Sequence, residues 1–221
     1  MTVTTHHPRL LVLALLGILP FLVNGLVNSV IAGSPLLYWS FELLTWIVIP
    51  TLIAWMAVRV APNGLRDFGL HGAIRGQANV GWVLLACLLF APLVYGVYRY
   101  GYDFFSAWLP SEGFFNYESV VPESGFFYVV VVIYFALSAG LVEEFLFRGL
   151  LWQAFSGFQH SLTLFLIISP ILFSLVDWEN GVANLAATYL VGIFMAIAYL
   201  GLRNLWPLIV GHVFTDLVWF G

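Results

Sequence analysis

The stretch FFYVVVVIYFALSAGLVEEFLFRG, residues 126–149, decides the class of this protein. Residues 126–142 carry no charged side chain, and the whole stretch exceeds the ~20 apolar residues that cross the hydrocarbon core of a bilayer. Glu143, Glu144 and Arg148 nevertheless follow within the same segment. Ionisable side chains inside a membrane span are costly, so by default they indicate a functional site.

The composition of the whole chain agrees with a membrane protein. Of the 221 residues, 62% are hydrophobic and only 8% are charged, and the mean hydropathy is +0.99, whereas a soluble domain carries roughly 25% charged residues. We therefore predict an all-α fold, a polytopic transmembrane helix bundle. The chain has no lysine and a net charge of −4, which argues against nucleic-acid binding. Cys87 is the single cysteine, so it cannot form an internal disulfide.

The apolar runs predict about seven spanning helices in a single domain, residues 1–221. The predicted spans are 9–31, 36–58, 79–99, 126–150, 161–177, 181–202 and 205–220. The first run is too long and too uninterrupted for an ordinary signal peptide, so we interpret it as a spanning helix.

Charged residues between the spans predict the orientation. Arginines precede span one and lie between spans two and three and spans six and seven: Arg9, Arg59, Arg66, Arg75 and Arg203. The connection 100–124 is acidic instead and contains Asp103, Glu112, Glu118 and Glu123. The positive-inside rule then places the N-terminus on the cytoplasmic side of the cell membrane. Segment 59–78 is either a short interfacial helix, with basic residues flanking Phe68 and Leu70, or a solvated loop.

Few ionisable side chains fall inside the spans, and their spacing suggests a shared site. Glu144 and Arg148 are four residues apart and can meet on one helix face, while Glu143 lies about 100° round the helix. His212 and Asp216 also share a face, and Asp177 closes span five. Span order puts Asp177 near the outer face and His212 deeper, so a polar cavity inside the bundle must join them.

This set of side chains suits general acid–base chemistry. A carboxylate in a medium of low dielectric has a raised pKa and can act as a base near neutral pH, and a histidine can move protons or stabilise an oxyanion. No G-x-S-x-G sequence and no reactive-looking cysteine supplies a nucleophile. Water activated by a carboxylate would then hydrolyse a peptide bond in or beside the membrane. Each residue alone could instead be structural, the Glu144–Arg148 pair above all.

The motifs resemble those of the CAAX prenyl protease and bacteriocin-processing family of glutamic-type intramembrane proteases. EEFLFR, residues 143–148, resembles the family's E-E-x-x-x-R motif, HVFTD, residues 212–216, resembles H-x-x-x-N/D, and DFGL, residues 67–70, is similar to the segment before the family's next helix. The motif-bearing core is about 125–221. The resemblance implies that Glu143 activates water, that His212 and Asp216 stabilise the oxyanion, and that Glu144 and Arg148 support the site.

The chain departs from the family at the middle motif, F-x-x-x-H, where it has Phe173 and then Asp177 in place of the histidine. Asp177 could act as a second carboxylate that shares a proton with Glu143. It could instead mark a site that binds without catalysis. A third reading is a zinc site with Glu143, Asp177 and His212 as ligands, although no H-E-x-x-H sequence is present.

The favoured interpretation is an intramembrane endopeptidase, without cofactor or metal, that cleaves membrane-associated peptides or proteins near a terminus. The alternative is a non-catalytic immunity or binding protein of the same fold. A proton-coupled carrier would also use buried carboxylates, but the chain shows no inverted repeats. The small size and the lack of a long soluble domain favour a prokaryotic protein, so a prenylated CAAX substrate is not expected.

Overall fold

The structure is a computed structural model that describes residues 7–74, 79–115 and 120–221. Arg75 and Glu118, which entered the prediction of orientation, lie outside the described residues. Within these ranges the chain forms helices and short connections, with no β-strand. The predicted all-α bundle is therefore confirmed.

Seven helical rods match the seven predicted spans in the described part of the chain. They are α1 (His7–Ile31); α2 (Pro35–Leu43) with the π-helix η1 (Leu44–Val48) and α3 (Ile49–Val60); α4 (Val80–Ser106); α5 (Phe126–Glu143) with the π-helix η4 (Glu144–Leu150) and α6 (Leu151–Phe155); α7 (Ser161–Val176); α8 (Val182–Leu202); and α9 (Trp206–Phe220). Five rods are long and apolar enough to cross a membrane, and α7 and α9 are shorter apolar helices. The protein is thus a multi-pass membrane protein.

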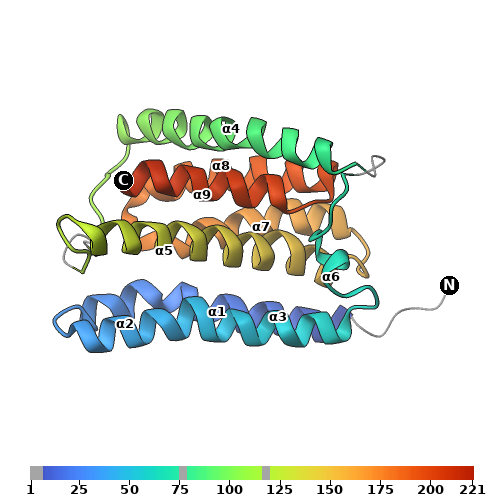
Figure 1. Cartoon of the computed structure of the whole chain (residues 1–221), viewed down its shortest axis with the longest axis horizontal. Coiled ribbons are helices and arrows are strands. Elements are labelled where there is room, and N and C mark those ends of the chain that lie inside the picture. The colour runs from blue at the N-terminus through green and yellow to red at the C-terminus, as the bar shows by residue number, and fades with distance from the viewer. Residues whose placement is uncertain (1–6, 75–78, 116–119) are drawn as a thin grey trace.

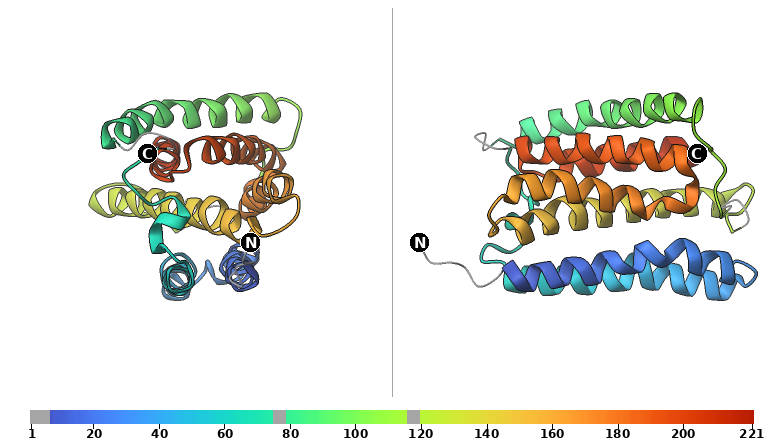
Figure 2. Two further views of the ribbon diagram at one scale, coloured as in Figure 1. Left: turned by 90° about the vertical axis from the view of Figure 1, so that its right-hand side faces the viewer. Right: turned by 180° about the vertical axis from the view of Figure 1, so that it is seen from behind.

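The rods lie roughly parallel or antiparallel to one another. The rod of α2, η1 and α3 lies beside α1 at one side of the bundle, and α4 forms the opposite side (Figures 1 and 2). Between them, α9 packs against α4 and α5, and α8 packs against α4 and α7. Large apolar side chains such as Leu84 and Leu88 stay exposed, as expected for helices that face lipid tails.

The two π-helices interrupt α-helical rods at defined places. In η1 the backbone N–H of Ile49 bonds to the carbonyl of Leu44, five residues earlier. Pro50 follows directly, and a proline ring excludes the carbonyl four residues before it from the normal ladder. Single π turns inside α-helices are rare and frequent at functional sites, and both of these lie next to buried charged side chains.

The connection between α3 and α4 docks into the bundle. It contains a 3-10 helix, η2 (Gly64–Phe68), and Phe68 is fully buried, with its ring 5.3 Å from that of Phe145. The Leu205 N–H bonds to the carbonyl of Gly69, and the Asn204 amide bonds to the carbonyl of His71 at 2.6 Å. Neither of the two readings of segment 59–78, an interfacial helix or a solvated loop, describes Phe68, because its ring fills a space in the core.

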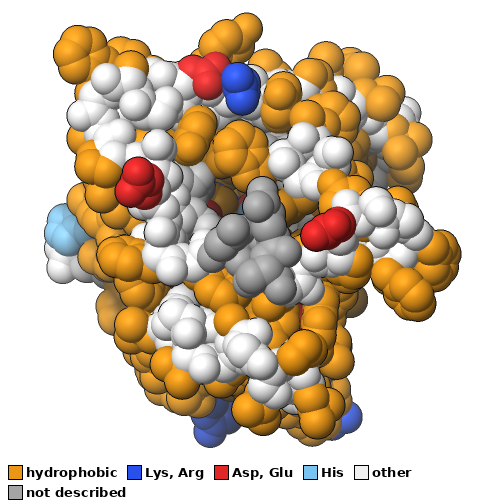
Figure 3. Space-filling view, turned by 90° about the vertical axis from the view of Figure 1, so that its left-hand side faces the viewer, with side chains coloured by type: hydrophobic (Ala, Val, Ile, Leu, Met, Phe, Trp, Pro, Cys, Tyr) orange, Lys and Arg blue, Asp and Glu red, His pale blue; other side chains and the backbone are white. Residues whose placement is uncertain are grey.

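Charge separates between the two ends of the bundle. The N-terminal end of α1, the end of α3, η2 and the α8–α9 connection lie together at one end (Figure 1), and these segments carry Arg9, Arg59, Arg66 and Arg203. The opposite end, viewed in Figure 3, shows several acidic side chains on a largely apolar surface. This separation supports the predicted orientation, which remains a prediction.

Candidate active site

A polar cavity lies inside the bundle, between α4, α5, α7, α8 and α9, and also reaches α2. Its volume is about 260 Å³, and four of the predicted site residues line it: Glu143, Asp177, His212 and Asp216. These side chains come from two rods, those of α5 and α9, and from the turn after α7. The bundle therefore contains the polar cavity that the sequence required.

Close packing of α5 on α9 positions the site. Gly140 is buried in α5, and a Cβ atom there would lie 2.5 Å from a methyl group of Val213 and 3.2 Å from the backbone nitrogen of that residue. Only glycine allows this approach. One turn further along this rod come Glu143, the last residue of α5, and Glu144, the first of η4. Val213 follows His212 directly, so the contact at Gly140 brings the carboxylates and the imidazole together.

Glu144 contacts both Arg148 and His212 through one oxygen. Its Oε1 accepts a hydrogen bond from Arg148 Nη1 at 3.0 Å and lies 2.9 Å from His212 Nδ1. Glu144 and Arg148 are both fully buried. The pairing of Glu144 with Arg148 agrees with the helix spacing, and the additional contact with His212 fixes the ring across the α5–α9 contact.

Phe173 supports the same group of side chains. The guanidinium carbon of Arg148 lies 4.0 Å from the centre of the Phe173 ring, and the edge-to-face contact with His212 has a centroid distance of 5.7 Å. A cation over an aromatic face is attracted by the ring quadrupole, the more so away from water. The phenylalanine of the middle motif thus holds Arg148 and His212 in place.

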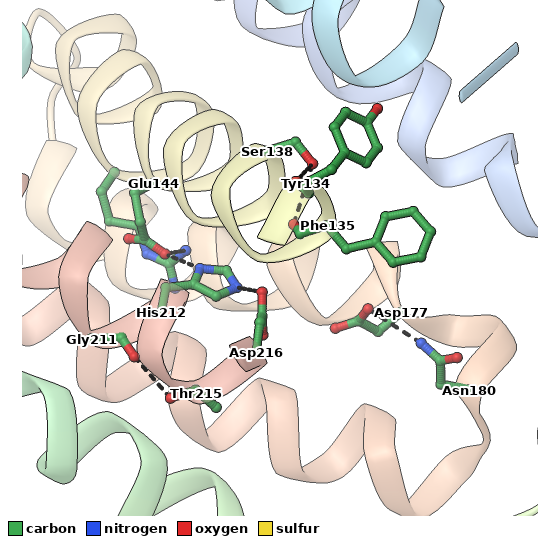
Figure 4. Close-up of polar contacts among 11 residues, drawn as sticks. Tyr134, Phe135, Ser138, Glu144, Asp177, Asn180, Gly211, His212, Thr215 and Asp216 are labelled. Carbon is green, nitrogen blue, oxygen red and sulfur yellow. Dashed lines mark hydrogen bonds and ion pairs between the residues drawn. The ribbon is translucent and has the colours of Figure 1, made fainter. Parts of the chain in front are cut away.

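The second ring nitrogen of His212 faces the cavity. Nε2 lies 3.5 Å from Asp216 Oδ2, which is at the limit of a hydrogen bond, and Figure 4 shows the imidazole between Glu144 and Asp216. Because Nδ1 is held by Glu144, Nε2 is the atom that can meet a ligand in the cavity.

Glu143 has different surroundings from its neighbour. Its side chain lines the cavity while the residue is only 4% exposed. Among the described residues no side-chain hydrogen bond holds its carboxylate. Glu144 therefore forms an ion pair with Arg148, whereas the adjacent Glu143 faces the cavity.

Asp177 lies at the end of α7 in a short turn that continues into the 3-10 helix η5 (Trp178–Asn180). Its carboxylate lies 3.4 Å from the Asn180 side-chain nitrogen, and Figure 4 shows both residues across the cavity from Asp216.

Several cavity residues escaped the sequence analysis. Glu42 in α2 lines the cavity, and it could have been found, because it is an ionisable residue inside a predicted span. Tyr98 and Asn184 also line it and are joined by a 2.7 Å hydrogen bond. No motif indicates these two, since their role depends on how α4 and α8 pack.

The geometry gives no support to the zinc reading. Over the residues that the structure describes, no group of three His, Cys, Asp or Glu side chains is arranged to hold a metal ion. Glu143, Asp177 and His212 line one cavity, but they do not converge on one point.

The fold and the cavity define a helical membrane protein with a carboxylate–histidine site inside the bundle. Residues 125–218 match the model of the family described as type II CAAX prenyl endopeptidase Rce1-like. This part of the chain holds EEFLFR, HVFTD and the altered middle motif, and it is similar to that family. No curated protein and no solved structure shows a significant match to the chain.

Proposed function

We propose that this protein is a glutamic-type intramembrane endopeptidase with Glu143 as the general base. Its substrates are membrane-associated peptides or proteins, cut near a terminus. The observation that carries the proposal is the shared cavity, which is lined by His212 and by Glu143, whose carboxylate has no side-chain hydrogen bond among the described residues. The family match supports a peptide hydrolase at the level of the family.

The proposed reaction needs only this chain and water. Glu143 takes a proton from a water molecule in the cavity as that water attacks the carbonyl carbon of the peptide bond. His212 in its doubly protonated form donates Nδ1–H to Glu144 and Nε2–H to the oxyanion. When the tetrahedral intermediate collapses, the C–N bond breaks and Glu143 returns its proton to the leaving amine.

Asp177 takes the place of a histidine in this proposal. As a carboxylate it accepts a hydrogen bond from the attacking water and orients it towards the substrate. Its position on the same cavity as Glu143 supports this role. Two carboxyl groups with one proton between them then replace a carboxylate and an imidazole.

Cleavage of membrane-anchored peptides tests the proposal. Wild type and Glu143→Gln are expressed in membranes and compared on a library of such peptides, with Glu123→Gln as the control, because Glu123 is an exposed carboxylate. We expect Glu143→Gln to lower kcat by about 10²–10⁴-fold, the usual contribution of a general base. Equal cleavage by wild type and Glu143→Gln would rule Glu143 out as the base.

The second candidate is a non-catalytic binding or immunity protein, which the aspartate at position 177 favours. Asp177→His separates the two functions. An enzyme adapted to aspartate loses activity with this change. A protein that cleaves nothing as wild type, but cleaves peptides as Asp177→His, would have a competent scaffold and a natural role in binding.

A further inference from the structure

A second group of buried polar side chains adjoins the cavity on the side of α1 and α2. Its members come from α1, the α2–η1 segment and α5: Asn24, Asn28, Tyr38, Glu42, Thr45 and Tyr134. Each has at least one buried polar atom without a hydrogen-bond partner in the part of the chain that the structure describes. Native proteins leave few such atoms, because each costs free energy comparable to a lost hydrogen bond.

These side chains surround two carboxylates. Glu42 is 3% exposed and Glu179, in η5, is 2% exposed, and the two lie close enough for their charges to interact. The Tyr38 side chain lies within electrostatic range of Glu42, Glu179 and Tyr134. Tyr38 is fully buried, and its hydroxyl has no hydrogen-bond partner among the described residues.

The backbone of α1 is shaped to admit Glu179. A Cβ atom on Gly25 would lie 2.6 Å from Glu179 Oε2 and 2.8 Å from its carboxyl carbon. Asn24 and Asn28 precede and follow this glycine on α1, and the indole N–H of Trp178 bonds to the Leu22 carbonyl at 3.2 Å. The turn after α7 thus places the Glu179 carboxylate against the backbone of α1 at Gly25.

Acidic side chains outnumber basic ones around the cavity. Glu42, Glu143, Asp177 and Asp216 all line it, whereas among the described residues His212 is the basic side chain that does so. Arg148 is bound to Glu144. A positive partner stabilises a carboxylate in a medium of low dielectric, which otherwise takes up a proton. Acceptor oxygens of Glu42, Asn24 and Asn28 have no hydrogen-bond donor among the described residues.

We propose that Glu42, together with Glu179 and the surrounding amides and hydroxyls, forms a subsite for a positively charged side chain, lysine or arginine, of the substrate. Glu42 connects the subsite to the candidate active site, because it belongs to the polar group and also lines the cavity. The substrate's ammonium or guanidinium supplies hydrogen-bond donors to the oxygen atoms of Glu42, Asn24 and Asn28. This subsite rests on the proposed function, since it selects which peptides enter the site.

Binding of a small probe tests the subsite without any cleavage. The probe is n-butylammonium chloride, which corresponds to the lysine side chain, and n-butanol is the uncharged control. We expect the probe to raise the Tm of the purified wild type in detergent in a concentration-dependent way, followed by tryptophan fluorescence. Glu42→Gln should abolish the rise, and the exposed Glu112→Gln should keep it.

A second variant tests the subsite independently, so that the test does not depend on Glu42→Gln remaining folded. Gly25→Ala displaces the Glu179 carboxylate, so it should weaken the response to n-butylammonium while Gly33→Ala, where a Cβ would meet nothing within 4 Å, should not. No difference between n-butylammonium and n-butanol in the wild type would overturn the subsite. A response to sodium over choline chloride, with none to n-butylammonium, would also overturn it in favour of a metal-ion site.

Cleavage then separates the subsite from the proposed function. On paired peptides that differ only as lysine or norleucine, we expect kcat/KM to be roughly tenfold higher for lysine, and the ratio to fall towards one in Glu42→Gln. A probe response without any cleavage would refute the protease and keep the cation subsite. Cleavage without preference, and without a probe response, would keep the protease and refute the subsite.

Discussion

At the scale of single residues, the two adjacent glutamates of the candidate site have different surroundings. Glu144 is fully buried and holds both Arg148 and His212 through one oxygen, whereas Glu143 faces the cavity. The sequence indicated this difference from the 100° step between neighbours on a helix. It could not indicate the contact between Glu144 and His212, which depends on how α5 meets α9.

Breaking the buried Glu144–Arg148 pair should lower the free energy of unfolding far more than breaking an exposed ion pair. Arg148→Met leaves a buried carboxylate with one partner fewer, and we expect the free energy of unfolding to fall by about 3–5 kcal/mol. The double variant Glu144→Gln/Arg148→Met should recover part of this loss. Unfolding in mixed micelles measures both.

The matched control is the exposed pair of Arg99 and Asp103, whose side chains are half exposed and 3.1 Å apart. Arg99→Met should change the free energy of unfolding by less than about 1 kcal/mol. If Arg148→Met and Arg99→Met lower the free energy of unfolding equally, the buried pair stabilises the fold no more than the exposed pair does.

At the scale of elements, the spans were predictable and their contacts were not. Apolar runs placed all seven rods, because composition and length alone decide membrane insertion. The end of α4 at Ser106 rather than near residue 99, and the docking of Phe68 into the core, depend on neighbours far along the chain. Glu42 was visible as a charge within a span, but the polar group around it was not, because its members come from separate helices.

The α5–α9 contact gives a prediction at this scale. Gly140→Ala adds a methyl group within 2.5 Å of Val213 and close to its backbone nitrogen, so α9 must move away from α5. The distance from Glu144 to His212 should then lengthen, and cleavage should fall by about tenfold or more, because small misplacements of catalytic groups are costly. Cleavage assays and Tm measure the two effects.

Gly96→Ala in α4 is the control for helix propensity, because a Cβ atom there meets nothing within 4 Å. Alanine is favoured over glycine inside a helix by up to about 1 kcal/mol, so this variant should be as stable as the wild type or more so. Full activity in Gly140→Ala would show that the close approach of α5 and α9 is not needed.

At the scale of the whole molecule, the two ends differ in charge and in their distance from the site. The basic end carries Arg9, Arg59 and Arg203, while Asp177 and the turn that holds Glu179 lie towards the acidic end, where α7 runs into α8 (Figure 2). The positive-inside rule places the basic end in the cytoplasm. The acidic subsite would then lie nearer the outer face, and a cationic segment would reach it from outside.

Thiol labelling in intact cells tests this orientation. In a Cys87→Ala background, Leu65→Cys places a thiol at the basic end and Glu123→Cys places one at the acidic end, and both positions are exposed. A membrane-impermeant maleimide should label Glu123→Cys in intact cells and Leu65→Cys only after permeabilisation. The Cys87→Ala parent shows the background. Labelling in the reverse order would place the basic end outside, and the cationic segment would then have to enter from the cytoplasm.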